Sequence, residues 1–326
     1  MVLWVYTWWL KWLAILTELI WVISKIMLSG PLSVLLEINS LCQLRCQYCS
    51  AAPFNGSQWP LPRAITLIEE LGKFPVWALT ISGGEPLLYP HLSELIEACF
   101  NVGIRPVINT NGLKLLDDKT FEGLVDLKDR GIEFTLSLSL DSAIPEENDF
   151  GRGRGLEVVE AIHRASVNGL DLTLSTVVHK GNLHSALKIP EVFDKIRQFR
   201  YSAVVVKHLS TNVASRLLAC DEDMQNFWHK ASQLQQEYSQ SRILLPFRVD
   251  SQQVPDTHIA RVQGKCFCGF TSCVIDSCFN VYPCDWARTE IVKMGNVENR
   301  SLKDVWLSKQ SESVRSQAQT KHLCSP

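Results

Sequence analysis

A strong charge imbalance is missing from this sequence. Its 32 Lys and Arg residues nearly balance 34 Asp and Glu residues, so the formal net charge is −2. Without a broad cationic field or a local basic cluster, the chain is not expected to bind nucleic acid. Internal repeats and low-complexity tracts are also missing, which argues against a repeat architecture or a disordered protein.

A secretory signal is likewise missing at the N-terminus. Residues 1–28 are almost continuously apolar and contain five tryptophans, but no basic stretch precedes them and no small-residue cleavage site follows. On a helix, Thr7, Lys11, Glu18 and Lys25 would form one narrow polar stripe. Such a helix suits either a membrane interface or packing against the protein's own fold or a dimer partner. Both interpretations stay open.

Cysteine is abundant, but its distribution does not suit disulfides. The 11 cysteines are grouped unevenly along 326 residues, whereas disulfide frameworks are typical of short secreted chains. Metal binding in a reducing compartment explains the grouping better. We therefore expect a cytoplasmic protein, which would be membrane-associated if residues 1–28 bind a membrane surface.

Short β-type runs alternate with amphipathic stretches through most of the chain. Six strands are expected, at residues 34–39, 77–82, 105–110, 133–141, 170–178 and 202–209. A helical stretch is expected before the last of them, at 184–199. This alternation predicts a parallel sheet, either in a full or partial barrel or in a doubly wound fold. In each architecture the reactive groups gather at the carboxyl ends of the strands.

Composition divides the chain into four parts. We expect an apolar helix at 1–30, a βα region at 31–220, a connecting helix and linker at 221–260, and a small cysteine-rich C-terminal domain at 261–326.

Three thiols follow the first predicted strand within one short loop. Cys42, Cys46 and Cys49 have CxxxCxxC spacing, and no other Cys or His lies nearby. Structural zinc normally takes four protein ligands, whereas a four-iron cluster held by three cysteines keeps one iron open. The spacing favours the open cluster, with structural zinc as the alternative.

A second motif, TISGGEP at residues 80–86, ends the second predicted strand. Gly83 and Gly84 would let the backbone approach a ligand closely, and Glu85 would pair with an ammonium group. The two motifs, in this order and with Tyr48 before the last cysteine, resemble those of the radical S-adenosylmethionine (SAM) superfamily.

The resemblance implies a partial (β/α)6 TIM-type barrel and a SAM-binding four-iron four-sulfur (4Fe-4S) cluster on the three cysteines. The GGEP segment, with Pro86, would receive the amino group of SAM. NTNG at 109–112 and SLSLDS at 137–142 resemble further SAM-contacting segments and nominate Asn109, Asn111, Ser139 and Asp141. In relatives, the residues that correspond to Ser139 and Asp141 approach the ribose hydroxyls of SAM.

A looser match, Asp149 to Arg152 as DxxR, implies that Arg152 pairs with the SAM carboxylate. Arg154 is the alternative for this role. Tyr48 completes the cofactor-binding residues that the resemblance implies.

The C-terminal cysteines resemble the SPASM/twitch extension of peptide-modifying radical SAM enzymes. Cys266, Cys284 and Cys324 match its ligand positions, and Phe279 stands where the extension has a turn glycine. The resemblance implies an auxiliary iron–sulfur cluster, with structural zinc as the alternative. Three alternatives for a fourth thiolate are Cys268, Cys273 and Cys278; otherwise one iron would be open to the substrate.

The resemblance thus implies an oxidoreductase that reductively cleaves SAM to a 5′-deoxyadenosyl radical, which abstracts hydrogen from the substrate. The extension implies maturation of a ribosomally made peptide by a cross-link, thioether or epimerisation, with a flavodoxin- or ferredoxin-type reducing partner. One alternative is a membrane-associated enzyme acting on a lipid or isoprenoid. Another is a non-enzymatic zinc or iron–sulfur protein.

Overall fold

The computed structural model of the chain describes a large part of the sequence. The described residues are 30–49, 55–203, 210–238, 242–245, 261–262, 265–266, 268–285 and 287–320. The apolar helix predicted within 1–30 and Cys324 therefore lie outside the described residues. Within the described ranges, no helix is long and apolar enough to cross a membrane.

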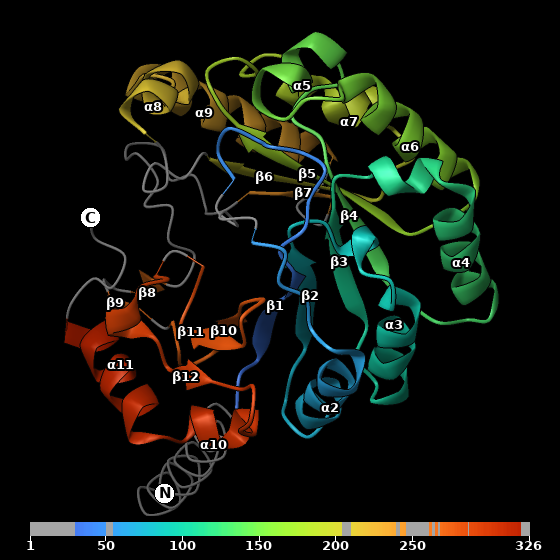
Figure 1. Ribbon diagram of the computed structural model, residues 1–326. Coiled ribbons are helices and arrows are strands. Elements are labelled where there is room, and N and C mark those ends of the chain that lie inside the picture. The colour runs from blue at the N-terminus through green and yellow to red at the C-terminus, as the bar shows by residue number, and fades with distance from the viewer. Residues whose placement is uncertain are drawn as a thin grey trace, which may run out of the picture.

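Seven parallel strands form a curved sheet in chain order (Figure 1). They are β1 (Ser33–Asn39), β2 (Ala78–Gly83), β3 (Pro106–Thr110), β4 (Thr135–Ser139), β5 (Leu172–Val178), β6 (Gln198–Ala203) and β7 (Ile243–Leu244). The predicted α/β fold with a parallel sheet is confirmed, and it is consistent with a partial barrel.

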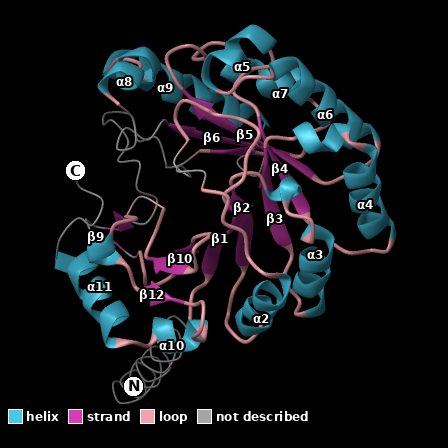
Figure 2. Cartoon of the chain, viewed as in Figure 1, coloured by secondary structure: helices cyan, strands magenta, loops and turns pink. Residues whose placement is uncertain are grey.

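Helices cover the outer face of this sheet, as Figure 2 shows. The described helices of this region are α2 (Leu61–Leu71), α3 (Leu92–Asn101), α4 (Asp118–Asp129), α5 (Pro145–Gly151), α6 (Gly155–Val167), α7 (Ile189–Val192), α8 (Thr211–Leu217) and α9 (Asp221–Tyr238). In α2 the buried residues are Ala64, Leu67, Ile68 and Leu71, which recur at helical spacing and form one apolar face.

One predicted helix is wrong. Residues 184–199 form only a 3-10 turn, η3 (Ala186–Lys188), followed by the four-residue α7, and β6 already begins at Gln198. Phe199 and Tyr201 are each 1% exposed and alternate along β6, so the strand pattern prevails at the end of this stretch. The part of the predicted strand at 204–209 lies outside the described residues.

The C-terminal part extends the same sheet. β10 (Ser272–Ile275) pairs in parallel with β1, and β11 (Asn280–Tyr282) and β12 (Gly295–Asn296) follow in antiparallel order. A separate two-stranded sheet joins β8 (Arg261–Val262) to β9 (Lys265–Cys266). Two helices end the described chain, α10 (Leu302–Trp306) and α11 (Lys309–Thr320). The cysteine-rich segment is thus continuous with the barrel sheet.

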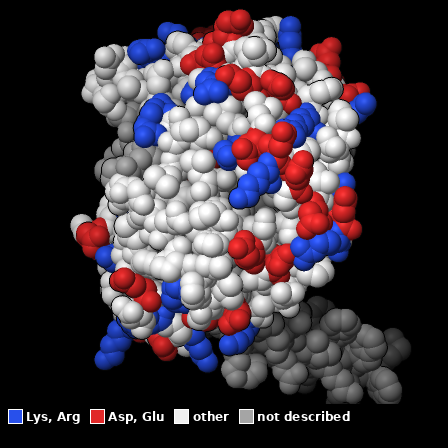
Figure 3. Space-filling model, turned by 45° about the vertical axis from the view of Figure 1, so that its right-hand side comes forward, with Lys and Arg blue, Asp and Glu red and all other residues white. Residues whose placement is uncertain are grey.

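Charged side chains of both signs are interspersed on the face shown in Figure 3. Many of them run from the top down the right half of this face, beside a broad area without charged side chains on its left.

Candidate active site

The loop with the three cysteines is fixed to the end of β2 by backbone hydrogen bonds. Gly84 N donates to Asn39 O over 2.9 Å, and Glu85 N donates to Leu41 O over 2.6 Å. A Cβ atom added at Gly83 would lie 2.2 Å from Asn39 O, and one at Gly84 would lie 2.1 Å from Leu41 O. Both glycines are therefore required by the approach of two chain segments, in addition to any ligand approach that the sequence predicts.

The three thiols of this loop are partly exposed, and the Cys42 thiol lies close to two polar donors. Cys42 Sγ lies 3.4 Å from Leu44 N and 3.8 Å from Asn111 Nδ2, which comes from the end of β3. Burial raises the pKa of the Cys42 thiol to about 11. Such a thiol binds as a thiolate when a metal centre compensates its charge.

Glu85 is 1% exposed and ties the ends of two strands together. Its Oε1 accepts from Leu87 N at 2.9 Å and from Thr110 Oγ1 at 2.6 Å, while Oε2 accepts from Asn111 N at 2.8 Å. Burial raises the pKa of Glu85, and these donors oppose the rise. The carboxylate already has a structural role, and its pairing with the SAM amino group stays a prediction.

A buried network anchors the middle of the cysteine loop. Asp141 is fully buried. Its Oδ1 lies 3.0 Å from Arg152 Nε and accepts a hydrogen bond from Val177 N at 2.9 Å. Its Oδ2 accepts a hydrogen bond from the Tyr48 hydroxyl. The Arg152 guanidinium carbon lies 5.4 Å from the centroid of the Tyr48 ring. Since Asp141 is engaged inside the protein, its predicted ribose contact stays a prediction.

The two arginines that the sequence left as alternatives lie in different surroundings. The Arg152 side chain is 10% exposed. Burial alone would lower the pKa of Arg152, but the nearby Asp141 and Tyr48 raise it by more, so its pKa lies above the usual value. The Arg154 side chain is 57% exposed and pairs with Glu157 at 2.5 Å. Arg152 alone of the two belongs to the buried network beside the cysteine loop.

The remaining predicted SAM contacts line the inner face of the sheet or its upper edge. Asn109 pairs in register with Ser137 of β4, and Ser139 at the end of β4 pairs with Ser175 of β5. Pro86 begins a buried 3-10 turn, η1 (Pro86–Leu88), directly above β2.

The C-terminal cysteines lie in different surroundings. Cys268 is buried beside Ala318 of α11, and Cys284 packs against this pair. Cys266 is the last residue of β9. Cys278 is exposed in the β10–β11 turn, with its Sγ 3.8 Å from Asn55 Nδ2.

Cys273 is the third alternative for the fourth thiolate. Its side chain is 2% exposed within the main hydrophobic core, in register with Val34, and burial raises its pKa to about 12. A thiol packed among aliphatic side chains behaves as a small apolar group. These surroundings favour Cys268 over Cys273 as the fourth thiolate, and a ligand role of Cys273 stays a prediction.

Sequence reasoning missed an ion pair that joins the cysteine-rich segment to the barrel. Arg288 Nη1 lies 2.8 Å from Glu37 Oε1 on β1, and Arg288 also pairs with Asp285, next to Cys284. The one signal in the sequence was Glu37 itself, an acid within an otherwise apolar strand. Arg288 fixes the segment that carries Cys284 against the inner face of β1.

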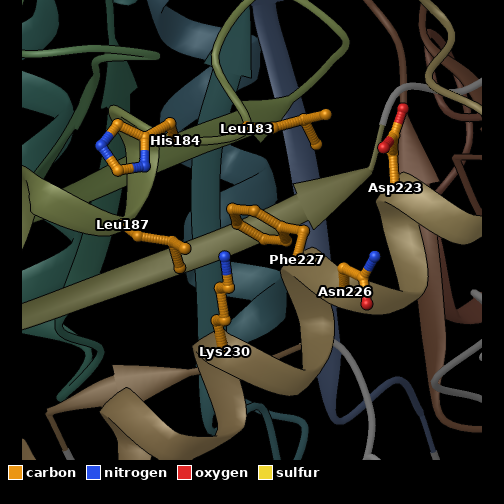
Figure 4. Close-up of a pocket in the computed structure, with 7 residues that line it drawn as sticks. All are labelled: Leu183, His184, Leu187, Asp223, Asn226, Phe227 and Lys230. Atoms are coloured by element: carbon orange, nitrogen blue, oxygen red, sulfur yellow. The ribbon is translucent and has the colours of Figure 1, made fainter.

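A cavity of about 200 Å³ lies away from these residues, between α9 and the turn at η3. Its lining includes Phe227 and Lys230 on α9 and His184 in the segment before η3, as Figure 4 shows. None of the predicted site residues lines it.

Two family models match the chain. The first, the radical SAM superfamily, matches residues 36–188, and the second, an iron–sulfur cluster-binding domain, matches residues 266–326. Together they cover more than half of the chain, including all three cysteines of the loop after β1. The chain belongs to the radical SAM superfamily. The resemblance stated from the sequence is confirmed.

Curated relatives of this radical SAM chain are enzymes. The AdoMet-dependent heme synthase of Methanosarcina barkeri is 25% identical over 301 residues, covering 86% of this chain and 83% of that protein. The PqqA peptide cyclase of Gluconobacter oxydans is 29% identical over 191 residues, covering 55% of this chain and 50% of that protein. These names support an enzyme and do not favour the non-enzymatic interpretation.

Solved structures confirm the fold. Streptococcus suis SuiB bound to S-adenosylmethionine aligns with a TM-score of 0.72 at 19% identity, covering 88% of this chain and 68% of that one. Native anSMEcpe with bound AdoMet aligns with a TM-score of 0.63 at 17% identity, covering 88% of this chain and 84% of that one.

A radical SAM domain implies a 4Fe-4S cluster and SAM, and the C-terminal domain supports an auxiliary cluster. The described residues fit this chemistry. Cys42, Cys46 and Cys49 are partly exposed thiols on one short loop, and a polynuclear cluster takes each thiolate at a different iron.

Proposed function

We propose that this protein is a radical SAM enzyme that modifies a ribosomally made peptide. The observation that carries the proposal is the pairing of β10 with β1, because it brings the cysteine-rich segment against the strand that leads into Cys42, Cys46 and Cys49. Relatives named PqqA peptide cyclase support a peptide substrate. The lipid or isoprenoid alternative has no comparable support.

We assign the roles of the protein's own groups as follows. Cys42, Cys46 and Cys49 hold the cluster that, with SAM, supplies radical hydrogen abstraction. Arg152 orients the SAM carboxylate, since its guanidinium lies beside the loop and Asp141 fixes it. Ser139 supports the ribose from the end of β4.

The GGEP segment has a second role in this proposal. The backbone bonds from Gly84 and Glu85 hold the cysteine loop in place, and Glu85 holds Asn111 beside Cys42. Asn109, on the inner face of β3, completes the polar wall. These contacts exclude water and limit the motion of the bound SAM, which favours reaction with the substrate over side reactions.

The auxiliary cluster takes its ligands from the C-terminal segment. We propose Cys266, Cys284 and Cys324 with Cys268 as the fourth thiolate, because Cys268 lies against Cys284. A catalytic unit at 31–220 and an auxiliary unit at 261–326, joined by 221–260, remain the proposed domains.

The peptide substrate is testable with the reconstituted enzyme, SAM and dithionite. Each short peptide encoded beside this gene is incubated and analysed by mass spectrometry. We expect one of them to lose hydrogen through a new cross-link, or to take up deuterium from heavy water on epimerisation. Turnover confined to a lipid, with every peptide unchanged, would contradict the proposal.

We also propose two partners, a reducing protein and a membrane surface. A flavodoxin- or ferredoxin-type protein would supply the electron, because SAM cleavage by the cluster is reductive. Residues 1–28 would bind a membrane surface. Co-flotation of the full chain with anionic vesicles, lost on deletion of these residues, tests the second proposal.

A further inference from the structure

Arg200 lies in the middle of β6 and faces the interior of the partial barrel. Its neighbours Phe199 and Tyr201 are each 1% exposed, and Tyr201 contacts Phe227 of α9 with ring centroids 5.9 Å apart. Successive side chains of a strand point to opposite faces. Since the neighbours of Arg200 face the helices, Arg200 faces inward.

The Arg200 guanidinium has no hydrogen-bond or ion-pair partner in the part of the chain that the structure describes. Two other arginines at the site differ in this respect, because Arg152 pairs with Asp141 and Arg288 pairs with Glu37. Arg200 is exposed, so its guanidinium is available to a ligand.

Arg200 is exposed on the inner face of the curved sheet, opposite to its buried neighbours. Its side chain is accessible to solvent, yet enough protein surrounds it for desolvation to lower its pKa. The guanidinium therefore faces the space inside the curved sheet rather than the outer, helix-covered surface. Such a space within a barrel is a typical place for a ligand.

The strand register places Arg200 near the predicted SAM pocket. Ser139 of β4 pairs with Ser175 of β5, which pairs with Arg200 of β6. Because neighbouring strands lie about 4.8 Å apart, the Cα atoms of Ser139 and Arg200 are separated by roughly 10 Å. A substrate bound between SAM and β6 would therefore lie within reach of the guanidinium.

We propose that Arg200 binds a carboxylate of the substrate and so holds the substrate next to SAM. The planar guanidinium presents paired N–H groups that match the two oxygens of a carboxylate. The inference rests on the proposed peptide-modifying function. It specifies an acidic side chain or the C-terminal carboxylate as the anchored group.

The test uses the full-length holoenzyme with its clusters oxidised, so that SAM is not consumed. Binding of N-acetylglutamate N-methylamide is titrated by saturation-transfer NMR, with the glutamine analogue as the neutral isostere and N-acetylalanine as the C-terminal carboxylate. We expect at least one of the two acids to bind and the neutral isostere not to bind. Failure of both acids to bind the wild type would overturn the inference.

Variants assign the binding to Arg200. Arg200→Gln should weaken binding of the acid by about tenfold or more, the loss expected for a charge-assisted pair, and Arg200→Lys should weaken it less. Arg197→Gln is the matched control, since Arg197 is 70% exposed near Asp171, and should bind within about twofold of wild type. Circular dichroism and iron content establish that each variant is folded.

Three results would overturn the inference: unchanged binding in Arg200→Gln, equal losses in the Gln and Lys variants, or displacement of the acid by SAM. The last result would mean that Arg200 serves the SAM carboxylate. Formation of 5′-deoxyadenosine by the same reduced enzyme is measured separately. An enzyme that cleaves SAM but binds no acid contradicts only this inference, whereas one that cleaves no SAM contradicts the proposed function.

Discussion

Asp141, Arg152 and Tyr48 determine how the cysteine loop is held. The Tyr48 hydroxyl reaches Asp141 from within the loop, and Asp141 fixes Arg152 on the same side. Sequence motifs nominated these three residues as ligand contacts. Their mutual contacts could not be predicted, because they depend on how α5 and the loop pack together, with Gln47 N donating to Gly151 O at 3.0 Å.

Replacing Arg152 tests its role at the level of a single residue. We expect Arg152→Gln to raise the KM for SAM by about tenfold or more, because it removes charge-assisted hydrogen bonds to the carboxylate. SAM-dependent formation of 5′-deoxyadenosine under dithionite gives KM and kcat. Iron content must be measured alongside, since the substitution also removes the partner of Asp141.

Arg154→Gln is the control for that measurement. Arg154 pairs only with Glu157 at the surface, so the KM for SAM should change by less than about twofold. Equal increases for both variants would mean that the effect is a general loss of positive charge.

The turn between β10 and β11 shows how one element joins the two parts of the site. Phe279 has φ of 67°, in the left-handed region, and its ring centroid lies 4.4 Å from that of Trp59. Trp59 Nε1 also donates to Asp276 O at 3.2 Å. The strained backbone persists because the ring fixes this turn against the loop that follows the three cysteines.

Substitutions at Phe279 separate the backbone effect from the ring contact. Phe279→Ala should lower the thermal midpoint of the holoprotein, because it removes the ring contact with Trp59 and keeps the backbone strain at residue 279. The lost contact should reduce the free energy of unfolding by about 1–3 kcal/mol. Phe279→Gly loses the same contact but relieves roughly 1 kcal/mol of strain. We expect the glycine variant to melt at or above the alanine variant, and the reverse order would contradict this account.

The sequence predicts local patterns of strands better than it predicts the packing of single side chains. Strands with alternating burial, such as β6, follow a local rule, but competing patterns obscured its start at Gln198. Cys273 lies in a cysteine-rich segment, and its packing within the core could not be predicted from that segment alone. Local sequence specifies which thiols are close in the chain, whereas the tertiary fold decides which of them face a metal.

Within the described residues, the barrel strands and β10–β12 form one continuous sheet, and only β8 and β9 form a separate pair. β10 closes the open edge of β1, and Arg63 of α2 donates to Val297 O at 2.8 Å and 2.6 Å. Pairing between segments more than 200 residues apart follows no local pattern, so the sequence motifs predicted both cysteine sets but not their connection. The sheet fixes the two sites relative to each other, because β1 leads directly into the first cysteine loop and carries Glu37, the partner of Arg288.

The most direct test of the central claim is formation of 5′-deoxyadenosine by the anaerobically reconstituted full-length chain, with SAM and dithionite. The account predicts product from the wild type and none from Cys46→Ser, which removes one of the three cluster ligands. Cys220→Ser, at an exposed cysteine outside the site, should retain the wild-type rate. Absence of product from an iron-loaded wild type, or equal product from Cys46→Ser, would contradict the account.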